Sequence, residues 1–420
     1  MNRCPLSVPR APLLALLTVA VFLNYIDRGT LALAAPLIQG ELHLTATGLG
    51  VLLSSFFWSY VLMHVPAGWL AERYGAHRVL ACGVALWSLA TALTSVASTF
   101  ATLLGLRLLL GVGESAFFPC SSKLLASEVD LRHRAMANGL ISFGLALGPA
   151  VGTYLGGQLM AVIGWRAVFA LFGCASLLWL IPWRRVPVRP ASAAAAASLT
   201  AQQSPSLADI LRQRALWGTC LGHLSANYNF NFMLSWLPFY LVKARGFSLA
   251  GMAGIAGFAY LLNALGSVAS GWATDRWIRR GVSANRVYKL IMAVNHVGAM
   301  VVTIGAVMAG PLTAIACLCL YQLLAGICGP GVYAIGQTLA GPAAAGRWIG
   351  IQNMVANLAG IAAPVITGVM VDATGTFVAA FVIAGAINVL GLLGWLVMIA
   401  RIAPLQWAAA GHVRSEPAPQ

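Results

Sequence analysis

Twelve long apolar runs, each about as long as a bilayer is thick, limit what this chain can fold into. A helix of about 20 residues crosses the hydrocarbon core, whereas a barrel strand needs only about ten. Backbone groups cannot stay unpaired in hydrocarbon, so runs of this length must be helices. We therefore predict an all-α polytopic membrane protein. The twelve predicted transmembrane helices lie at residues 12–36, 45–70, 78–97, 100–122, 135–161, 166–183, 215–242, 248–273, 288–309, 312–340, 348–371 and 376–400.

The composition agrees with this reading. The 420 residues are 60% apolar and only 8% charged, whereas a soluble domain carries about 25% charged residues. A net charge of +15 would also suit a nucleic-acid partner. The basic residues, however, are scattered singly between the apolar runs, so we assign them to membrane orientation and expect no nucleic acid.

Basic residues are distributed very unevenly between the two sides of the predicted bundle. Of the 25 Lys and Arg residues, only Arg166, Lys243 and Arg245 fall on the side away from the termini. Two more lie within spans, and all the others fall on the side that holds both termini. Basic loops stay in the cytoplasm, so we predict cytoplasmic termini in a multi-pass plasma (inner) membrane. Arg3 and Arg10 precede the first run, which we interpret as a retained helix rather than a cleaved signal.

One long polar segment divides the twelve runs into six and six. Residues 184–214 contain three prolines and an Ala/Ser-rich stretch, and we predict a cytoplasmic linker with a surface helix from Ser206 onward. The predicted parts are an N-terminal half at 1–183, a C-terminal half at 215–401 and a cytoplasmic tail at 402–420. The third and fourth runs adjoin without a charge, and we separate them at the polar turn Thr94–Thr99.

The two halves repeat one another. Three dipeptides recur 203 residues later, namely Asn24-Tyr25 as Asn227-Tyr228, Gly68-Trp69 as Gly271-Trp272, and Glu72-Arg73 (as an acid–arginine pair) as Asp275-Arg276. Such a register indicates duplication. Two pseudo-symmetric six-helix halves are typical of transporters, which bind their substrate between the halves near the middle of the membrane.

Four charged residues lie inside the predicted spans, all in the first half: Asp27, Arg28, Arg107 and Glu114. A charge at mid-membrane costs about 2.5–3.5 kcal/mol on insertion scales and is accepted mainly where it meets a partner or a watery path. Adjacent residues point about 100° apart on a helix, so Asp27 and Arg28 need partners elsewhere. Asp27 with Arg107 and Arg28 with Glu114 is one option. The four charges either fix helix packing or bind a ligand and protons.

The stretch Gly68-Trp69-Leu70-Ala71-Glu72-Arg73-Tyr74-Gly75-Ala76-His77-Arg78 resembles the loop motif of the major facilitator superfamily, with Glu72 in place of the usual aspartate. Its glycines suit a turn, and its charges can pair across a gap that closes in only one state. The resemblance and its echo in the second half predict a cytoplasmic gate formed by Gly68, Glu72, Arg73, Gly75, Arg78, Asp275 and Arg276.

A narrower resemblance is carried by Asn24-Tyr25-Ile26-Asp27-Arg28, together with Tyr60, Arg107 and Glu114. These residues resemble the anion:cation symporter family, which includes permeases for sugar acids and for phthalate-like aromatic acids. The resemblance implies that Asp27 and Glu114 carry protons and that Arg28 binds the substrate carboxylate. It gives Tyr25, Tyr60 and Arg107 supporting roles.

Apart from Lys289 at the very start of the span 288–309, the spans of the second half contain no Asp, Glu, Lys or Arg, and offer neutral polar groups instead. Amides both donate and accept hydrogen bonds, which suits hydroxyl groups, although they also join neighbouring helices. The resemblance favours Asn353 as a substrate contact, with Asn357 as the alternative counterpart. The predicted substrate-binding residues are Tyr25, Arg28, Tyr60, Arg107, Asn227, Asn231, Gln337, Asn353 and Asn357.

The sequence thus predicts proton-coupled uptake of a small organic anion by a monomer in the lipid bilayer. The anion is a sugar acid, such as a hexonate or hexuronate, or an aromatic carboxylate flanked by Phe and Trp residues. The alternative is a proton-coupled exporter, because Gly144, Gly148-Pro149 and Gly152 nearly match a drug-antiporter motif. A receptor is a further alternative. No catalytic triad, metal-ligand spacing or phosphate loop is present in the sequence, so we predict neither an enzyme nor a cofactor or metal beyond the protons.

Overall fold

The computed structural model describes residues 10–43, 46–186, 205–239, 249–308, 310–374 and 376–407. These residues form helices and contain no strand. The predicted span ends at 240–242 and 248, most of the linker and most of the tail lie outside the described residues.

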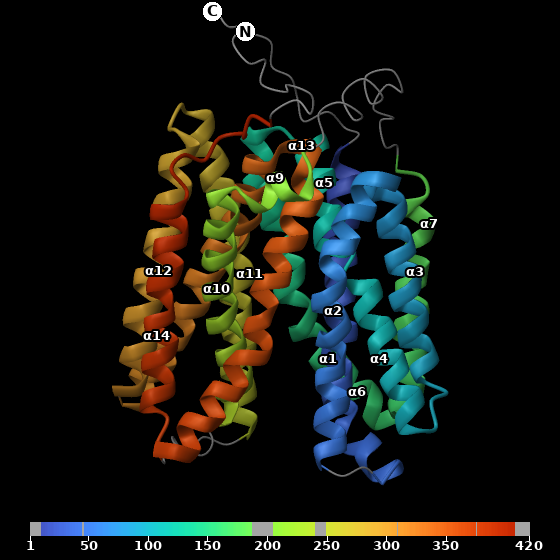
Figure 1. Cartoon of the computed structure of the whole chain (residues 1–420). Helices are drawn as coiled ribbons and strands as arrows, with labels where there is room; N and C mark the ends of the chain where they lie inside the picture. The colour runs from blue at the N-terminus through green and yellow to red at the C-terminus, as the bar shows by residue number, and fades with distance from the viewer. Residues whose placement is uncertain are drawn as a thin grey trace, which may run out of the picture.

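The helices form two groups that lie side by side (Figure 1). The first group consists of α1 (Arg10–Glu41), α2 (Ala46–Tyr74), α3 (Ala76–Thr94), α4 (Phe100–Glu114), α5 (Phe117–Glu128), η1 (Leu131–His133), α6 (Arg134–Leu178) and α7 (Leu180–Trp183). The second group consists of α9 (Leu207–Leu211), α10 (Arg214–Phe239), α11 (Leu249–Arg279), α12 (Ala284–Met308), α13 (Pro311–Thr374), α14 (Val378–Leu392) and η3 (Leu393–Met398).

Two of these helices are in fact pairs of arms joined at a glycine. α6 breaks at Gly164 (φ 77°, ψ 161°) and α13 breaks at Gly341 (φ 66°, ψ 179°). Only glycine adopts such backbone angles without steric cost, so these residues turn the chain at the points where the sequence predicted loops. Each arm therefore corresponds to one predicted span.

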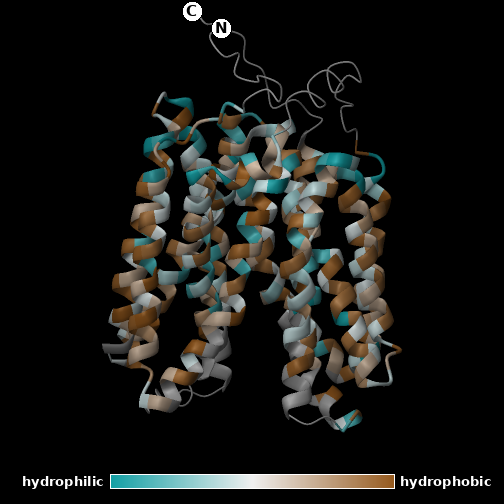
Figure 2. Ribbon diagram, viewed as in Figure 1, coloured by the Kyte–Doolittle hydropathy of each residue, from teal (hydrophilic) through white to brown (hydrophobic). Residues whose placement is uncertain are grey.

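The described residues contain as many long helical arms as the sequence predicts. By length and composition, eight stretches of the described residues can cross a membrane, and one of them, Leu312–Ala363, runs through both arms of α13. The remaining long helices, α2, α10 and α11, have 29, 26 and 31 residues. Together they make twelve long helical arms. Figure 2 shows hydrophobic residues along most of their length and hydrophilic residues gathered at one end.

Local signals set the helix boundaries as expected. Thr99 caps α4 by accepting a hydrogen bond from the backbone N–H of Thr102, which ends the turn that separates α3 from α4. Ser206 caps the short helix α9 in the same way, through Asp209. α9 begins where the sequence predicted a surface helix.

The two groups meet closely at one end, which we call the linker side because α7 ends there and α9 begins there (Figure 1). A Cβ at Gly68 in α2 would overlap the carbonyl oxygen of Gly346 in α13. A Cβ at Gly271 in α11 would lie only 2.7 Å from the carbonyl oxygen of Ala135 in α6. The duplicated glycines of the repeat therefore allow equivalent backbone contacts between the groups.

Replacing Gly68 by Leu should force the linker side open, because the new side chain has no space against Gly346. Spin labels at the exposed residues Tyr74 and Trp277, on a cysteine-free background, should report a longer distance by pulsed electron resonance. Gly105→Leu is the matched control, since no atom lies within 4 Å of a Cβ at Gly105. An unchanged label distance in Gly68→Leu would show that this contact does not hold the groups together.

Candidate functional site

A buried ion pair joins α1 to α4 inside the first group. Arg28 donates to Glu114 Oε2 from Nη2 at 2.6 Å and from Nε at 3.1 Å. The Glu114 side chain is fully buried, while 18% of the Arg28 side chain is exposed. Asn24 Oδ1 also accepts from Arg28, at 3.4 Å. Arg28 is thus a membrane-embedded cation that its acid partner neutralises while leaving it partly accessible.

Three aromatic rings surround this cation. The Arg28 Cζ atom lies 4.6 Å from the ring centres of Tyr25 and Tyr60 and 4.7 Å from that of Phe56. Ring faces attract a guanidinium group and exclude water from it. The structure therefore brings together Tyr25, Arg28, Tyr60 and Glu114, as the resemblance implied.

The second possible pairing, Asp27 with Arg107, is not formed. Asp27 points toward α6, where its Oδ2 atom accepts a hydrogen bond from Ser176 at 3.3 Å and its Oδ1 atom has no partner. Arg107 lies against the ring of Phe56, with its Cζ atom 5.2 Å from the ring centre, and its Nε atom has no partner. Both residues are buried. The described part of the chain thus contains an embedded acid and an embedded cation that do not neutralise each other.

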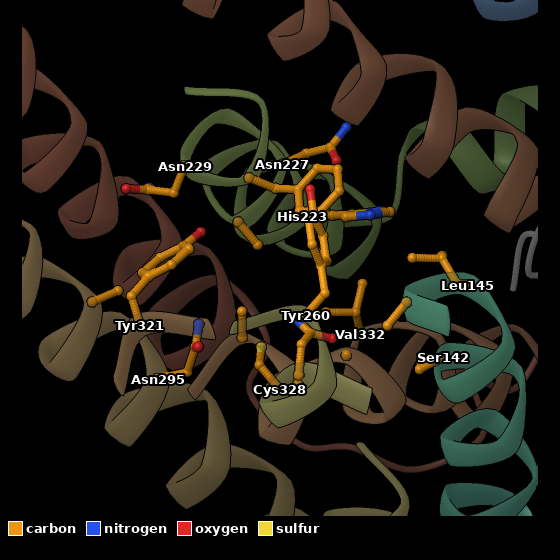
Figure 3. A pocket seen from close by; sticks show the side chains of 18 of the residues that line it. Ser142, Leu145, His223, Asn227, Asn229, Tyr260, Asn295, Tyr321, Cys328 and Val332 are labelled. Carbon is orange, nitrogen blue, oxygen red and sulfur yellow. The ribbon is translucent and has the colours of Figure 1, made fainter. Parts of the chain in front are cut away.

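A cavity of about 140 Å³ lies between the two groups and reaches into the second group (Figure 3). The first group contributes Tyr25 from α1 and Ser142, Leu145, Ala146 and Pro149 from α6. All the other lining residues come from α10 to α14. Because Tyr25 lines the cavity and also contacts the Arg28 guanidinium, it connects the ion pair to this space.

The predicted asparagines lie on α10 and α13 and present free amide atoms. Asn227 lines the cavity and donates to the Ala356 carbonyl at 2.9 Å. Asn231 and Asn357 donate to backbone carbonyls one turn earlier in their own helices, at 2.8 Å. Asn353 accepts from the Tyr333 hydroxyl at 3.4 Å, and its amide nitrogen has no partner. These residues remain candidates for substrate contact.

Gln337 lies in a different environment from the other predicted contacts. It exchanges two hydrogen bonds with Asn138 of the first group, at 2.9 Å and 3.0 Å, and donates to Ser122 at 3.2 Å. Both amides are buried, and neither residue lines the cavity. In this conformation Gln337 joins the groups on the linker side, where no solute can reach it. Its role in substrate binding stays a prediction for a conformation in which the groups have separated.

The predicted gate residues divide into those that cross between the groups and those that do not. Glu72 forms an ion pair with Arg347 and accepts from its backbone N–H at 3.0 Å. Asp275, its repeat counterpart, accepts from the backbone N–H groups of Ala135 and Met136 in the first turn of α6, at 3.1 Å and 2.9 Å. An acid near the start of a helix offsets the positive end of its dipole. Each group therefore supplies one acid to a helix of the other.

The predicted basic gate residues form no ion pair or cation–π contact with the other helix group among the described residues. Arg73 lies over the Trp69 ring and Arg276 over the Trp272 ring, both on their own helices. Arg78 is exposed, and Gly75 turns the chain between α2 and α3 with φ of 90°. The cation that meets Glu72 is instead Arg347, which the sequence indicated only as a basic loop residue.

Several further polar residues line the cavity without having been predicted as contacts, among them Asn229, Tyr260, Asn295 and Tyr321. Asn229 belongs to the asparagine-rich stretch of α10, but it does not share a helix face with the predicted contacts Asn227 and Asn231. Nothing in the sequence separates the other three from ordinary helix residues.

Comparisons with known proteins identify the family and the fold. A family model described as the Major Facilitator Superfamily matches residues 17–364. The chain is 30% identical to a hexuronate transporter of Bacillus subtilis (strain 168), over 98% of this chain and 99% of that protein. It is 29% identical to a probable L-galactonate transporter of Escherichia coli (strain K12), over 91% and 88%. The solved structure of the proton:xylose symporter XylE superposes with a TM-score of 0.76 at 14% identity, over 92% and 95%.

The linker-side contact of Asp275 should depend on pH. Burial raises the pKa of Asp275 from its ordinary value of 3.8 to about 7, against the lowering effect of the Met136 and Ala135 N–H groups. The contact is therefore favoured fully below about pH 4 and weakens as the pH rises toward 7. The distance between spin labels at Tyr74 and Trp277 should show that the linker side is closed in fewer molecules at about pH 8 than at about pH 5.

The matched variant for this measurement is Asp275→Asn, which cannot ionise. It should remove the part of the pH dependence that Asp275 contributes between about pH 5 and 7. An identical pH profile in the wild type and in this variant would contradict the assignment.

Proposed function

Because the chain belongs to the major facilitator superfamily, we propose that it is a secondary active transporter that takes up a small organic anion together with protons. The observation that carries the proposal is the ion pair between Arg28 and Glu114, held in an aromatic enclosure that adjoins the cavity. Buried ion pairs give little net stability compared with apolar replacements, so their retention inside a membrane points to use. The family consists of transporters and not of enzymes.

The substrate class follows from the cation and from the relatives. The partly exposed Arg28 can exchange the carboxylate of Glu114 for that of a solute. Hexuronate and L-galactonate, which name the two relatives described above, are carboxylates that carry several hydroxyl groups. We infer that this chain carries an anion of the same kind, a hexuronate or hexonate. An aromatic carboxylate is the alternative.

Competition for Arg28 would couple the anion to a proton. When a solute carboxylate binds Arg28, Glu114 loses its cation while it remains buried, and a buried acid without a partner costs least in its neutral form. Protonation of Glu114 in turn frees Arg28 for the anion. Because such coupling is reciprocal, each ligand promotes the binding of the other, which is the requirement for symport.

Asp27 is the proposed second proton carrier. It is buried and forms no ion pair with a described residue, and its Oδ2 atom accepts from the Ser176 hydroxyl, so no cation has to leave before it takes up a proton. Arg107 contacts the same Phe56 ring as Arg28, with its Cζ atom 5.2 Å from the ring centre, and forms no ion pair with a described residue. We propose that Arg107 adds positive charge to the anion site.

Transport also requires the linker side to open. We propose that the two groups are the rocking halves of the transporter, and that the linker side faces the cytoplasm with both termini. The contacts that must then part are the ion pair of Glu72 with Arg347, the contact of Asp275 with α6, and the amide pair of Asn138 with Gln337. The cavity would release its solute to the cytoplasm once they separate.

Export is the alternative direction, and its main support was the glycine pattern in α6. These glycines pack against α1: a Cβ at Gly144 would lie 2.6 Å from the Thr18 carbonyl oxygen, and one at Gly148 would lie 2.8 Å from that of Phe22. Close packing between helices therefore accounts for them, as it does in many membrane proteins. They give antiport no separate support.

Neutral replacements of the two buried acids should abolish proton-driven accumulation. We expect proteoliposomes that contain Asp27→Asn, Glu114→Gln or both to fail to concentrate radiolabelled glucuronate on an inward proton gradient, because each single variant lacks one of the two proposed proton carriers and the double variant lacks both. Glu41→Gln is the control, since Glu41 forms an exposed ion pair with Arg166. Uphill uptake by the double variant would exclude the coupling mechanism. Gradient-driven depletion by the wild type would instead indicate an exporter.

Removal of the Arg28 cation should abolish anion binding. Loss of one partner of a buried charge pair costs about 2 kcal/mol or more, so Arg28→Ala should bind glucuronate at least about 30-fold more weakly in isothermal titration. Arg28→Ala combined with Glu114→Gln leaves no unpaired charge, and should recover thermal stability without recovering binding. Arg166→Ala is the surface control. Wild-type affinity in the double variant would show that the anion binds elsewhere.

A further inference from the structure

We propose that the part of the cavity inside the second helix group is a hydroxyl-binding subsite, formed by Asn229, Tyr260, Asn295 and Tyr321, which holds the polyhydroxylated chain of the transported anion. This inference rests on the proposed function. It assigns binding roles to four residues that belong neither to the charged site nor to the predicted substrate-binding asparagines. It also decides between the two substrate classes, since an aromatic acid has no groups for these residues to bind.

The location of the cavity is the first support. Its lining residues come from α10, α11, α12, α13 and α14, so it extends from the boundary between the groups into the interior of the second group. Asn229, Tyr260, Asn295 and Tyr321 come from α10, α11, α12 and α13, respectively. Figure 3 shows their side chains around the same space. Four helices thus contribute one polar side chain each.

The hydrogen-bonding state of these residues is the second support. The Oδ1 atom of Asn229 is buried and has no partner, while its amide nitrogen donates to the Ser225 carbonyl at 3.0 Å. The structure records no hydrogen bond from the Asn295 amide, the Tyr260 hydroxyl or the Tyr321 hydroxyl to any described residue. Unpaired amides and hydroxyls inside a membrane protein are costly, and polar groups there normally find partners. A solute or water must therefore supply the missing partners.

Other polar residues of the same cavity are held by the protein and show the contrast. The Asn388 Oδ1 atom lies 3.0 Å from His296 Nδ1, and the Asn263 amide donates to Gln322 at 3.2 Å. Gln352 donates to His223 at 3.3 Å. These bonds fix part of the wall. The four proposed residues are among the polar groups that this wall leaves available to a ligand.

The chemistry of the available groups specifies the ligand. Amides offer donors and acceptors, and phenol hydroxyls do both, which matches alcohol groups. The lining contains no Asp, Glu, Lys or Arg, so a second charge would have no partner there. A volume of about 140 Å³ suits a small solute, since drug-sized ligands occupy about 300–1,000 Å³. The ligand is therefore a small, neutral, hydroxylated chain.

Tyr25 places this subsite within reach of the cation. Its ring lines the cavity on one side, and the Arg28 Cζ atom lies 4.6 Å from its centre. One solute can therefore put its carboxylate at Arg28 and its hydroxyl groups in the cavity. The first group would then bind the charge while the second group distinguishes the uncharged body.

The test compares solutes that differ only in their hydroxyl groups. Gluconate and hexanoate are six-carbon monocarboxylates with and without hydroxyls, and benzoate represents the aromatic acids. Their affinities are measured by isothermal titration on the purified full chain in detergent. The variants are Tyr260→Phe and Tyr321→Phe, which remove one hydroxyl each with little change of shape, and Asn295→Leu. Tyr288→Phe is the matched control, because its hydroxyl is also buried and unpartnered but does not line the cavity.

We expect the wild type to bind gluconate at least about tenfold more tightly than hexanoate or benzoate, because sites built to bind hydroxyls reject analogues that lack them. Each subsite variant should weaken gluconate binding severalfold and leave benzoate binding unchanged, and Tyr288→Phe should change neither. Two results would overturn the inference: equal affinity for gluconate and hexanoate, or unchanged gluconate binding in all three variants. Either result would mean that water alone fills the cavity, and would leave the proposed anion transport intact. Failure of the wild type to bind any of the three carboxylates would overturn the proposed function as well.

Discussion

The ion pair between Arg28 and Glu114 is the interaction on which the organisation of the first helix group depends. It joins α1 to α4 inside the membrane, and neither charge could remain there alone at an acceptable cost. The rings of Tyr25, Phe56 and Tyr60 enclose the cation and hold α2 against the same point. A bond that a competing anion can replace is therefore also the centre of a packed helix cluster. Replacement of the Glu114 carboxylate by an anion would therefore act directly on the packing of these helices.

On the linker side, the duplication produces two equivalent contacts that hold the helix groups together. Glu72 reaches from α2 to α13, and Asp275 reaches from α11 to α6. Gly68 and Gly271, four residues before each acid, allow the backbones to approach closely enough for these bonds. The buried amide pair of Asn138 and Gln337 adds a third connection that has no repeat counterpart among the described contacts. Such a closure opens only when several bonds break together, which favours two discrete states over a gradual movement.

The two helix groups also differ in chemical character, and the difference suits an anion with a neutral body. The charged residues that lie far from the ends of the described helices, namely Asp27, Arg28 and Arg107, and Glu114, the partner of Arg28, belong to the first group. The second group presents amides, phenols and a histidine around the cavity. The proposed carboxylate site and the proposed hydroxyl subsite thus have complementary chemistry and belong to different helix groups. Alternating access can then occur by movement of one surface against the other.

Much of the fold could be read from the sequence because its causes are local. A run of about 20 apolar residues must form a helix in hydrocarbon, whatever its neighbours are. The breaks at Gly164 and Gly341 and the cap at Thr99 follow from backbone sterics and from nearby hydrogen bonds. The cost of a charge in a membrane likewise made Asp27, Arg28, Arg107 and Glu114 conspicuous without any knowledge of their partners.

Partners, by contrast, were decided only by the tertiary structure. Neighbouring residues on a helix point about 100° apart, so small differences in helix rotation determine which neighbour each one meets. Asp27 faces Ser176 and not Arg107, Glu72 meets Arg347, and Gln337 faces Asn138 instead of the cavity. The hydroxyl-lined space needs four helices from distant parts of the chain, and no local pattern marks it. The sequence by itself determined which segments enter the membrane and which charges enter with them, because both depend on transfer from water to hydrocarbon. The packing of the helices alone determined which of those groups are satisfied and which remain open to a ligand.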